Sequence, residues 1–248
     1  MQFSDEPAFD HRDRRDIYEY IERYGVVDPE DARRSLDMSQ EAFGHHVAAL
    51  RRESVVDRTE DGDLRIAFED DDEETFQLAN GTEVTIRQAR QDDLTSLIGA
   101  IRAALSGDTY IVGETVADVV DHENVLLRSN ELESRVFFVA TIRDDIVGWV
   151  HVDAPKQSKL SHTAELTVGV LPSHRDEGIG SRLHDRGVEW AEEHGLKKLY
   201  NSVPSTNEAA IEFLEGRGWE VEAVREDHYQ IDDEHVDEVM LAKYLDSL

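Results

Sequence analysis

The chain has 248 residues, enough for one large domain or two smaller ones with a buried core. Its 26 basic and 56 acidic residues give a formal net charge of −30, and the absence of cysteine excludes disulfides, thiolate catalysis and zinc–thiolate sites. No apolar run approaches the length of about 18 residues that a membrane helix needs, and no signal peptide is evident. We therefore expect a cytoplasmic protein that does not bind a membrane.

The acidic residues are spread over periodic, foldable segments and are not gathered in one tail. Together with scarce lysine and absent cysteine, they resemble the composition of halophilic, haloarchaeal proteins, whose acidic surfaces keep them soluble in concentrated salt. We interpret the charge as a sign of habitat and not of a binding site. The densest acidic run predicts a linker at 69–81, between an N-terminal domain at 1–68 and a second domain at 82–248.

The N-terminal segment predicts three helices and a hairpin. Apolar residues at helical spacing end at Gly25, and Asp28, followed by a proline, is a good start for a second helix. Ser39 can cap a third helix over 39–52, after which two short apolar runs flank a Glu-Asp-Gly-Asp turn. This order of elements resembles a winged helix-turn-helix domain.

A winged helix-turn-helix would bind DNA through its third helix. The side chains that would face DNA are Ser39, Gln40, His45, His46, Arg51 and Arg52. Residues 10–66 hold 10 arginines and 15 acidic residues, and this net negative charge disfavours binding to DNA phosphates at ordinary salt. High salt would screen charges of both signs and weaken that objection. A small helical domain that contacts its neighbour or a partner protein is the alternative, so DNA and protein partners both remain open.

From residue 82 onward the sequence alternates between strand and helix patterns, without an internal repeat. We expect strands at 82–89, 135–142, 146–154, 163–172, 197–204, 219–231 and 237–245. We expect helices at 91–106, around 114–129, at 178–195 and at 207–218. The alternation predicts an α/β domain.

The stretch VGVLPSHRDEGIGSRL, residues 168–183, places two glycines between a strand and a helix. Gly178 and Gly180 would let backbone N–H groups approach a ligand at a helix N-terminus, where the macrodipole also favours anions. Arg175 would add a charge contact or brace the loop. The Lys-[Ser/Thr] pair of a P-loop and the full glycine set of a dinucleotide fingerprint are both missing. A phosphate or pyrophosphate is the expected ligand.

Two blocks with their flanks resemble the GCN5-related N-acetyltransferase (GNAT) family over roughly 82–248. The first block, V-x-P-x-x-R-x-x-G-x-G, is matched by Val170, Pro172, Arg175, Gly178 and Gly180. The second block, N-x-x-A-x-x-F-x-x-x-x-G-[FW], is matched by Asn207, Ala210, Phe213, Gly218 and Trp219. The resemblance implies an α/β (α+β) fold with a mixed, splayed central sheet, acetyl-CoA as co-substrate and no metal.

In that family the pantetheine arm lies in the split of the sheet and a glycine loop holds the pyrophosphate. The resemblance implies the cofactor-binding residues Leu166, Val168, Val170, Arg175, Asp176, Glu177, Gly178, Ile179, Gly180, Ser181 and Asn207. A neutral amine would attack the thioester directly with the help of a base, and the N–H of Val168 would stabilise the oxyanion.

Glu165 is the candidate base, because relatives often place a glutamate early in the fourth strand, and His162 is the other candidate. Many relatives carry a tyrosine acid directly after the position of Phe213, where this chain has Leu214. Tyr229 or water would then protonate the leaving thiolate, unless the thiolate leaves without a proton donor. The alternative for Tyr229 is a role in the hydrophobic core.

The resemblance implies an N-acetyltransferase that acts on a primary amine of a protein or small molecule, with the N-terminal domain as a recruiting or regulatory module. The alternative is a transcriptional regulator that uses a degenerate acetyltransferase domain as an acetyl-CoA sensor. A homodimer formed through the C-terminal strands remains open.

Overall fold

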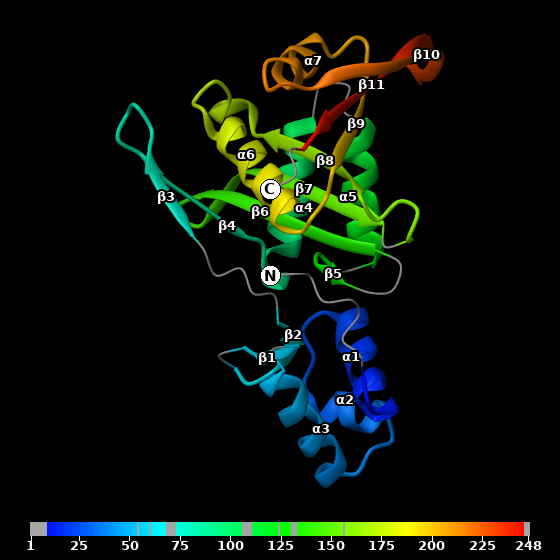
Figure 1. Ribbon diagram of the computed structural model, residues 1–248. Helices are drawn as coiled ribbons and strands as arrows, with labels where there is room; N and C mark the ends of the chain where they lie inside the picture. Colours follow the sequence, from blue (N-terminus) through cyan, green and yellow to red (C-terminus); the bar gives the residue numbers. More distant parts are fainter. Residues whose placement is uncertain are drawn as a thin grey trace.

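The computed structural model describes residues 9–53, 55–59, 61–67, 73–105, 111–123, 125–129, 133–155 and 157–245. Its N-terminal part contains three helices and a two-stranded antiparallel sheet (Figure 1). These elements are α1 (Arg12–Tyr24), α2 (Pro29–Ser35), α3 (Gln40–Arg52), β1 (Val56–Arg58) and β2 (Leu64–Ile66). The three helices and the hairpin expected from the sequence are therefore present.

Side-chain caps define the starts of these helices. Asp28 accepts hydrogen bonds from the N–H groups of Glu30 and Asp31, at 2.9 and 3.0 Å, and Ser39 accepts one from Ala42 at 3.2 Å. The apolar faces then pack into one small core, whose buried members include Ile17, Ile21, Phe43, Val47, Leu50 and Leu64. This core is separate from the cores of the larger domain.

The larger domain contains strands and helices in alternation, as expected. Its strands are β3 (Glu74–Gln77), β4 (Glu83–Gln88), β5 (Arg128–Ser129), β6 (Glu133–Ile142), β7 (Asp145–Pro155), β8 (Thr163–Val170), β9 (Lys198–Pro204), β10 (Glu220–Ile231) and β11 (Glu234–Tyr244). Its helices are η1 (Gln91–Asp93), α4 (Leu94–Leu105), α5 (Ile111–Glu123), η2 (Pro172–His174), α6 (Ile179–Glu193) and α7 (Glu208–Glu215).

The strands form one mixed sheet in the order β10-β11-β9-β8-β7-β6-β4-β3, with β5 added beside β6. The neighbours pair antiparallel except β8 and β9, which run parallel. One buried cluster joins the sheet to α6 and α7, and a second joins its other face to α4 and α5. Helices therefore cover both faces, which confirms the predicted α/β fold with a mixed sheet (Figure 1).

Two details differ from the sequence prediction. β3 lies inside the predicted linker at 69–81 and pairs with β4, so residues 74–77 belong to the sheet. The helix expected around 114–129 covers 111–123, and β5 follows it. Residues 68–72, in the acidic run, and 106–110 lie outside the described residues.

The sheet splits between β8 and β9. Their parallel pairing is limited to Thr163, Ala164 and Glu165, which lie opposite 198–200. Beyond that point the amide of Asn201 on β9 donates a hydrogen bond to the carbonyl of Leu166 on β8. The rest of β8 faces a gap, which is the splay that the resemblance implied.

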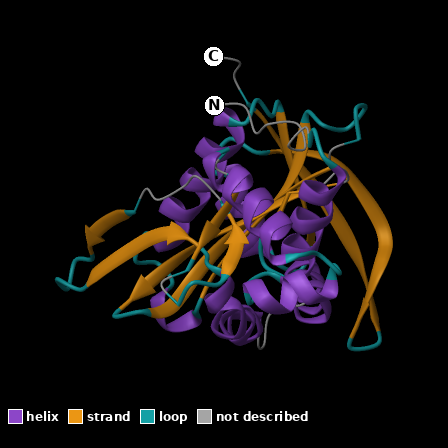
Figure 2. Cartoon of the chain, turned by 90° about the horizontal axis from the view of Figure 1, so that it is seen from below, coloured by secondary structure: helices purple, strands orange, loops and turns teal. Residues whose placement is uncertain are grey.

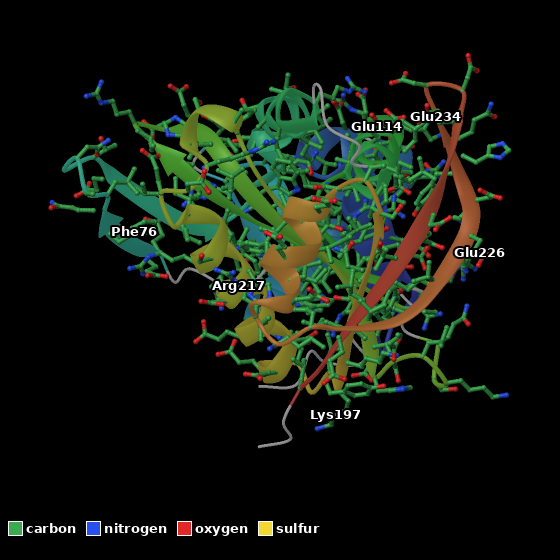
Figure 3. The ribbon with its side chains drawn as sticks, turned by 90° about the horizontal axis from the view of Figure 1, so that it is seen from above. Phe76, Glu114, Lys197, Arg217, Glu226 and Glu234 are labelled. Carbon is green, nitrogen blue, oxygen red and sulfur yellow. The ribbon has the colours of Figure 1, made fainter. Side chains whose placement is uncertain are left out.

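The β10–β11 hairpin extends away from the helices (Figure 2), and Glu226 and Glu234 lie along it in Figure 3. β10 is an edge strand and is exposed along nearly its whole length. At the opposite side, Glu22 of α1 lies 3.9 Å from Arg128 and connects the N-terminal part to the larger domain. Among the described residues, no helix has the length and apolar character needed to cross a membrane.

Candidate active site

A cavity of about 300 Å³ occupies the gap between β8 and β9. Its walls come from β8, β9, α5, α7 and the loop that leads into α6. The sequence-predicted residues that line it are Val168, Val170, Arg175, Asp176, Gly178, Gly180, Ser181 and Asn207. The fold thus brings the two sequence blocks together around one cleft.

The backbone of β8 presents alternate residues to this cleft. The carbonyl of Leu166 accepts from Asn201 on β9, and the carbonyl of Val170 accepts from the Arg175 side chain at 3.3 Å. Because strand residues alternate in direction, Val168 also points its N–H and C=O away from β7 and into the gap. These are the three β8 residues that the resemblance assigned to cofactor binding.

The glycine loop ends in a backbone conformation that opens the N-terminus of α6. Gly178 is the N-cap residue with φ of 84°, a left-handed conformation that costs glycine little, and no side chain caps the helix. The side chain of Arg175 donates to the carbonyls of Ala104 and Val170, at 2.9 and 3.3 Å. Arg175 therefore braces the loop against α4 and β8, the second of its two expected roles.

Asn207 and Ser181 face the cleft from α7 and α6. The Asn207 side-chain oxygen caps α7 by accepting from the N–H of Ala210 at 3.2 Å, whereas its buried Nδ2 has no hydrogen-bond partner. Ser181 accepts a hydrogen bond from Arg217, which lies beside α7 in Figure 3. An unpaired buried N–H group is costly, so Asn207 is suited to donate to a ligand.

A second cavity of about 220 Å³ has two lining residues in common with the first, Ile111 and Val112. It lies between α5 and the sheet. The residues lining it are Ile111, Val112, Thr115, Val116, Val119, Val120, Arg135, His151, Asp153 and Glu165. We call this cavity the α5 chamber.

Two carboxylates stand side by side in the α5 chamber, because Asp153 of β7 pairs with Glu165 of β8. Burial, and then the nearby Asp153, raise the pKa of Glu165 to about 7. A carboxylate with this pKa can exchange a proton near neutrality, as a general base must. Glu165, the candidate base, thus lies in the α5 chamber with a raised pKa.

His151 also lines the α5 chamber, although it is only 3% exposed. Both of its ring nitrogens lack a hydrogen-bond partner, and the Phe137 ring lies 4.5 Å from its own. Burial, and secondarily Arg135, lower its pKa to about 3, so the imidazole is neutral near pH 7.

Several sequence-predicted residues do not line either of the two cavities. Tyr229 lies on β10 and donates to Glu238 at 3.1 Å; its pKa is raised to about 12, chiefly by burial. His162 is exposed in the turn before β8. Glu177 lies 3.1 Å from the His174 ring, and Ile179 is buried in the core. None of these four side chains lines either cavity.

Sequence reasoning missed His151, Asp153 and Asn201. Each is a polar residue inside an apolar strand, a signal that also fits a solvent-facing position. His151 and Asn201 are in fact buried, because α5 and the paired strands cover them. Their burial results from contacts with segments that are distant in the sequence, so local sequence patterns do not reveal it.

In the N-terminal part, α3 carries the residues proposed to face DNA. Gln40, His45, Arg51 and Arg52 are exposed, and the hydroxyl of exposed Ser39 caps the helix. His46 is buried, and its Nε2 lies 3.4 Å from Asp13. His46 therefore packs inside the N-terminal part and is not exposed as the other five residues are.

Similarity to known proteins agrees with this geometry. Residues 57–219 match the model of the acetyltransferase (GNAT) family, which is more than half of the chain. No curated protein matches the sequence.

Solved structures share the fold. A GNAT-family acetyltransferase from Streptococcus pneumoniae has a TM-score of 0.55 at 21% identity, over 65% of this chain and 99% of its own. The ribosomal-protein-S18-alanine N-acetyltransferase of Escherichia coli has a TM-score of 0.52 at 20% identity, over 66% and 95%. A putative acetyltransferase from Salmonella typhimurium, solved with its cofactor acetyl-CoA, has a TM-score of 0.56 at 19% identity, over 66% and 95%. The chain therefore belongs to the acetyltransferase (GNAT) family, as an N-acetyltransferase whose co-substrate is acetyl-CoA.

Proposed function

We propose that the protein transfers an acetyl group to a primary amine, which reaches acetyl-CoA bound between β8 and β9 from the α5 chamber. The observation that carries this proposal is that Ile111 and Val112 line both cavities. One cavity offers backbone groups and a helix N-terminus, and the other offers a carboxylate whose pKa is about 7. A thioester at their junction would be open to an amine from the α5 chamber.

Different residues of the cleft would bind different parts of acetyl-CoA. The backbone of Leu166, Val168 and Val170 would pair with the pantetheine amides as an added strand would. The N–H groups of 178–181 would bind the pyrophosphate at the start of α6. The unpartnered Nδ2 of Asn207 fits a carbonyl of the pantetheine arm.

Glu165 would act as the base. An acceptor amine arrives as an ammonium ion, and the carboxylate of Glu165 takes its proton directly or through water. The neutral amine attacks the thioester carbonyl, and the Val168 N–H stabilises the oxyanion. The carbon–sulfur bond then breaks and CoA leaves as a thiolate.

Water, or the proton released by the attacking nitrogen, would protonate that thiolate. Leu214 occupies the position of the family's tyrosine and lines the cleft without a proton to give. The hydroxyl of Tyr229 is bonded to Glu238 and is a weaker acid than an ordinary tyrosine, since its pKa is about 12. We therefore assign Tyr229 a structural role on β10.

The N-terminal part would act as a winged-helix module that recruits the enzyme or regulates it. Support comes from the order of three helices and a hairpin, with Arg51 and Arg52 exposed at the end of α3. Replacing both arginines by glutamate should abolish retention on DNA if they contact phosphates. Unchanged retention by the double variant would leave a protein partner as the ligand of this module.

The test of the enzymatic proposal is release of free CoA from acetyl-CoA in the presence of a panel of amines, in molar KCl. We expect release that depends on the acceptor and is lost in Gly180→Glu, because the new side chain would enter the cleft with a negative charge. Tight acetyl-CoA binding without turnover, together with acetyl-CoA-dependent DNA binding, would instead identify a sensor.

A further inference from the structure

A cluster of nitrogen and oxygen donors lies in the N-terminal part, where α1 packs on α3. One ring nitrogen from each of His11 and His46 and one carboxylate oxygen of Asp13 all lie within 4.8 Å of one another. His11 is the N-cap residue of α1, Asp13 lies in the first turn of that helix, and His46 belongs to α3. The fold thus brings together metal-ligating side chains from two helices.

The separations of these atoms suit a shared ion better than direct hydrogen bonds. The Oδ2 atom of Asp13 lies 3.4 Å from Nε2 of His46 and 3.7 Å from Nδ1 of His11. Both distances exceed the range of about 2.7–3.2 Å that is usual for an N–H···O hydrogen bond. Two ligands of one tetrahedral Zn²⁺, each about 2.0–2.1 Å from the ion, lie about 3.3–3.4 Å apart. The measured separations are therefore close to those between ligands of one small cation.

The carboxylate of Asp13 faces imidazoles although it stands between two arginines in the sequence. Arg12 lies 3.6 Å from Asp16, and Arg14 donates to Glu53 at the end of α3, at 2.9 Å. Within the described part of the chain, the ion-pair distances of the Asp13 carboxylate are to the two histidines. Two imidazoles and one carboxylate are a donor set that suits Zn²⁺ and other divalent transition metals.

The cluster is half enclosed. His46 is only 9% exposed, and its Nδ1 has no hydrogen-bond partner among the described residues. The ring of His11 lies 4.6 Å from that of His46 but is itself exposed, so an ion could enter from its side. At Nδ1 of His11 the ion would compete with one long hydrogen bond, the 3.2 Å cap from the Asp13 N–H. Three protein ligands would leave the fourth position to water.

We propose that His11, Asp13 and His46 form a binding site for a divalent transition cation that prefers imidazole, such as Zn²⁺. The ion would fix the start of α1 to α3, the helix that carries exposed Arg51 and Arg52. Because the chain has no cysteine, all the ligands are nitrogen and oxygen. The site lies outside residues 82–248, to which the GNAT resemblance and its expectation of no metal apply, and it is independent of acetyl transfer.

The experiment titrates Zn²⁺ by calorimetry into the full chain, which has first been treated with EDTA and dialysed. The buffer contains molar KCl and excess Mg²⁺. The chain carries 56 acidic residues, so salt is needed to screen weak binding to surface carboxylates, and Mg²⁺ occupies sites made only of oxygen ligands. We expect one saturable Zn²⁺ site per chain. Absence of such a site, or its displacement by Mg²⁺, would overturn the proposal.

The variant His11→Asn removes the imidazole and keeps a side chain that is a strong N-cap, so it separates metal binding from helix capping. Its dissociation constant for Zn²⁺ should rise at least about 100-fold, because loss of a partner behind a metal ligand already costs about 10- to 100-fold. The matched control is His45→Asn, the same change at an exposed histidine of α3 that is not among the three donors; it should keep the wild-type constant. Wild-type affinity in His11→Asn, or an equal loss in His45→Asn, would overturn the proposal.

Denaturant unfolding gives a second readout. Zn²⁺ binds the folded arrangement of the three donors, so it should raise the unfolding midpoint of the wild type and of His45→Asn by mass action. The midpoint of His11→Asn should not change with Zn²⁺. A rise of the same size in His11→Asn would show that the ion binds elsewhere and would contradict the assigned site.

Discussion

Replacing Glu165 by glutamine should make the protein more stable and nearly inactive. The chamber raises the pKa of Glu165 from 4.5 to about 7, so the folded protein bears a cost whenever this group is charged. The difference between these two pKa values corresponds to about 3 kcal/mol. Glutamine has the same shape and no charge, so it avoids that cost.

The size of this stabilisation depends on pH. Below pH 4.5 the carboxyl is protonated in both the folded and the unfolded chain, and the glutamine variant should gain nothing. Between pH 4.5 and about 7 the unfolded chain loses its proton first, so the wild type is progressively destabilised as the pH rises. The variant should be more stable by less than about 1 kcal/mol at pH 5 and by about 3 kcal/mol at pH 8.

Denaturant unfolding of the unliganded protein at both pH values, in the same salt, measures this difference. The matched control is Glu83→Gln, an exposed strand position, which should change the free energy of unfolding by less than about 0.5 kcal/mol. Acetyl transfer by Glu165→Gln should fall by a factor of about 10² to 10⁴. A variant that is less stable than the wild type at pH 8, or that keeps its activity, would refute the reasoning.

Three further substitutions test the cleft. Asn207→Ala should raise the acetyl-CoA dissociation constant about tenfold by calorimetry, since it removes the unpartnered Nδ2; an unchanged constant would contradict that contact. Gly169→Ala should lower the free energy of unfolding by about 1–3 kcal/mol, because its Cβ would lie 2.2 Å from the Trp149 ring. Arg175→Met should lower both stability and acetyl-CoA affinity, because the loop loses its bond to Ala104; wild-type affinity would show that the bracing is dispensable.

Local features of the sequence predicted most of the residues that were assigned to the cavity between β8 and β9 and that line it. A glycine such as Gly178 at a strand-to-helix turn, and an asparagine that caps a short helix, act within a few residues of their own position. The order of strands and helices follows from hydrophobic periodicity, which is also local. These signals do not require knowledge of which strands pair.

The α5 chamber could not be predicted in this way. His151 and Asp153 alternate with apolar residues on β7, as solvent-facing residues do, and only the packing of α5 turns that face into an interior. β3 was not predicted as a strand, because its Thr-Phe pair directly follows an acidic run and lies at the edge of the sheet. The surroundings of Tyr229 depend on the edge position of β10 and on the hydrogen bond to Glu238, and neither can be predicted from local sequence.

The split sheet also has a consequence for the order of events in a catalytic cycle. Between β8 and β9 the described links in the sheet are three residue pairs, the backbone hydrogen bonds from Lys197 and Lys198 to His162, and the Asn201 side chain; they join the half that ends at β8 to the half formed by β9, β11 and β10. A pantetheine arm in the gap would connect the two halves, and CoA retains that arm after the acetyl group has left. Release of CoA would thus require the two halves of the sheet to separate slightly between β8 and β9. The rigidity of this boundary would therefore set the rate of CoA release and not the rate of acetyl transfer.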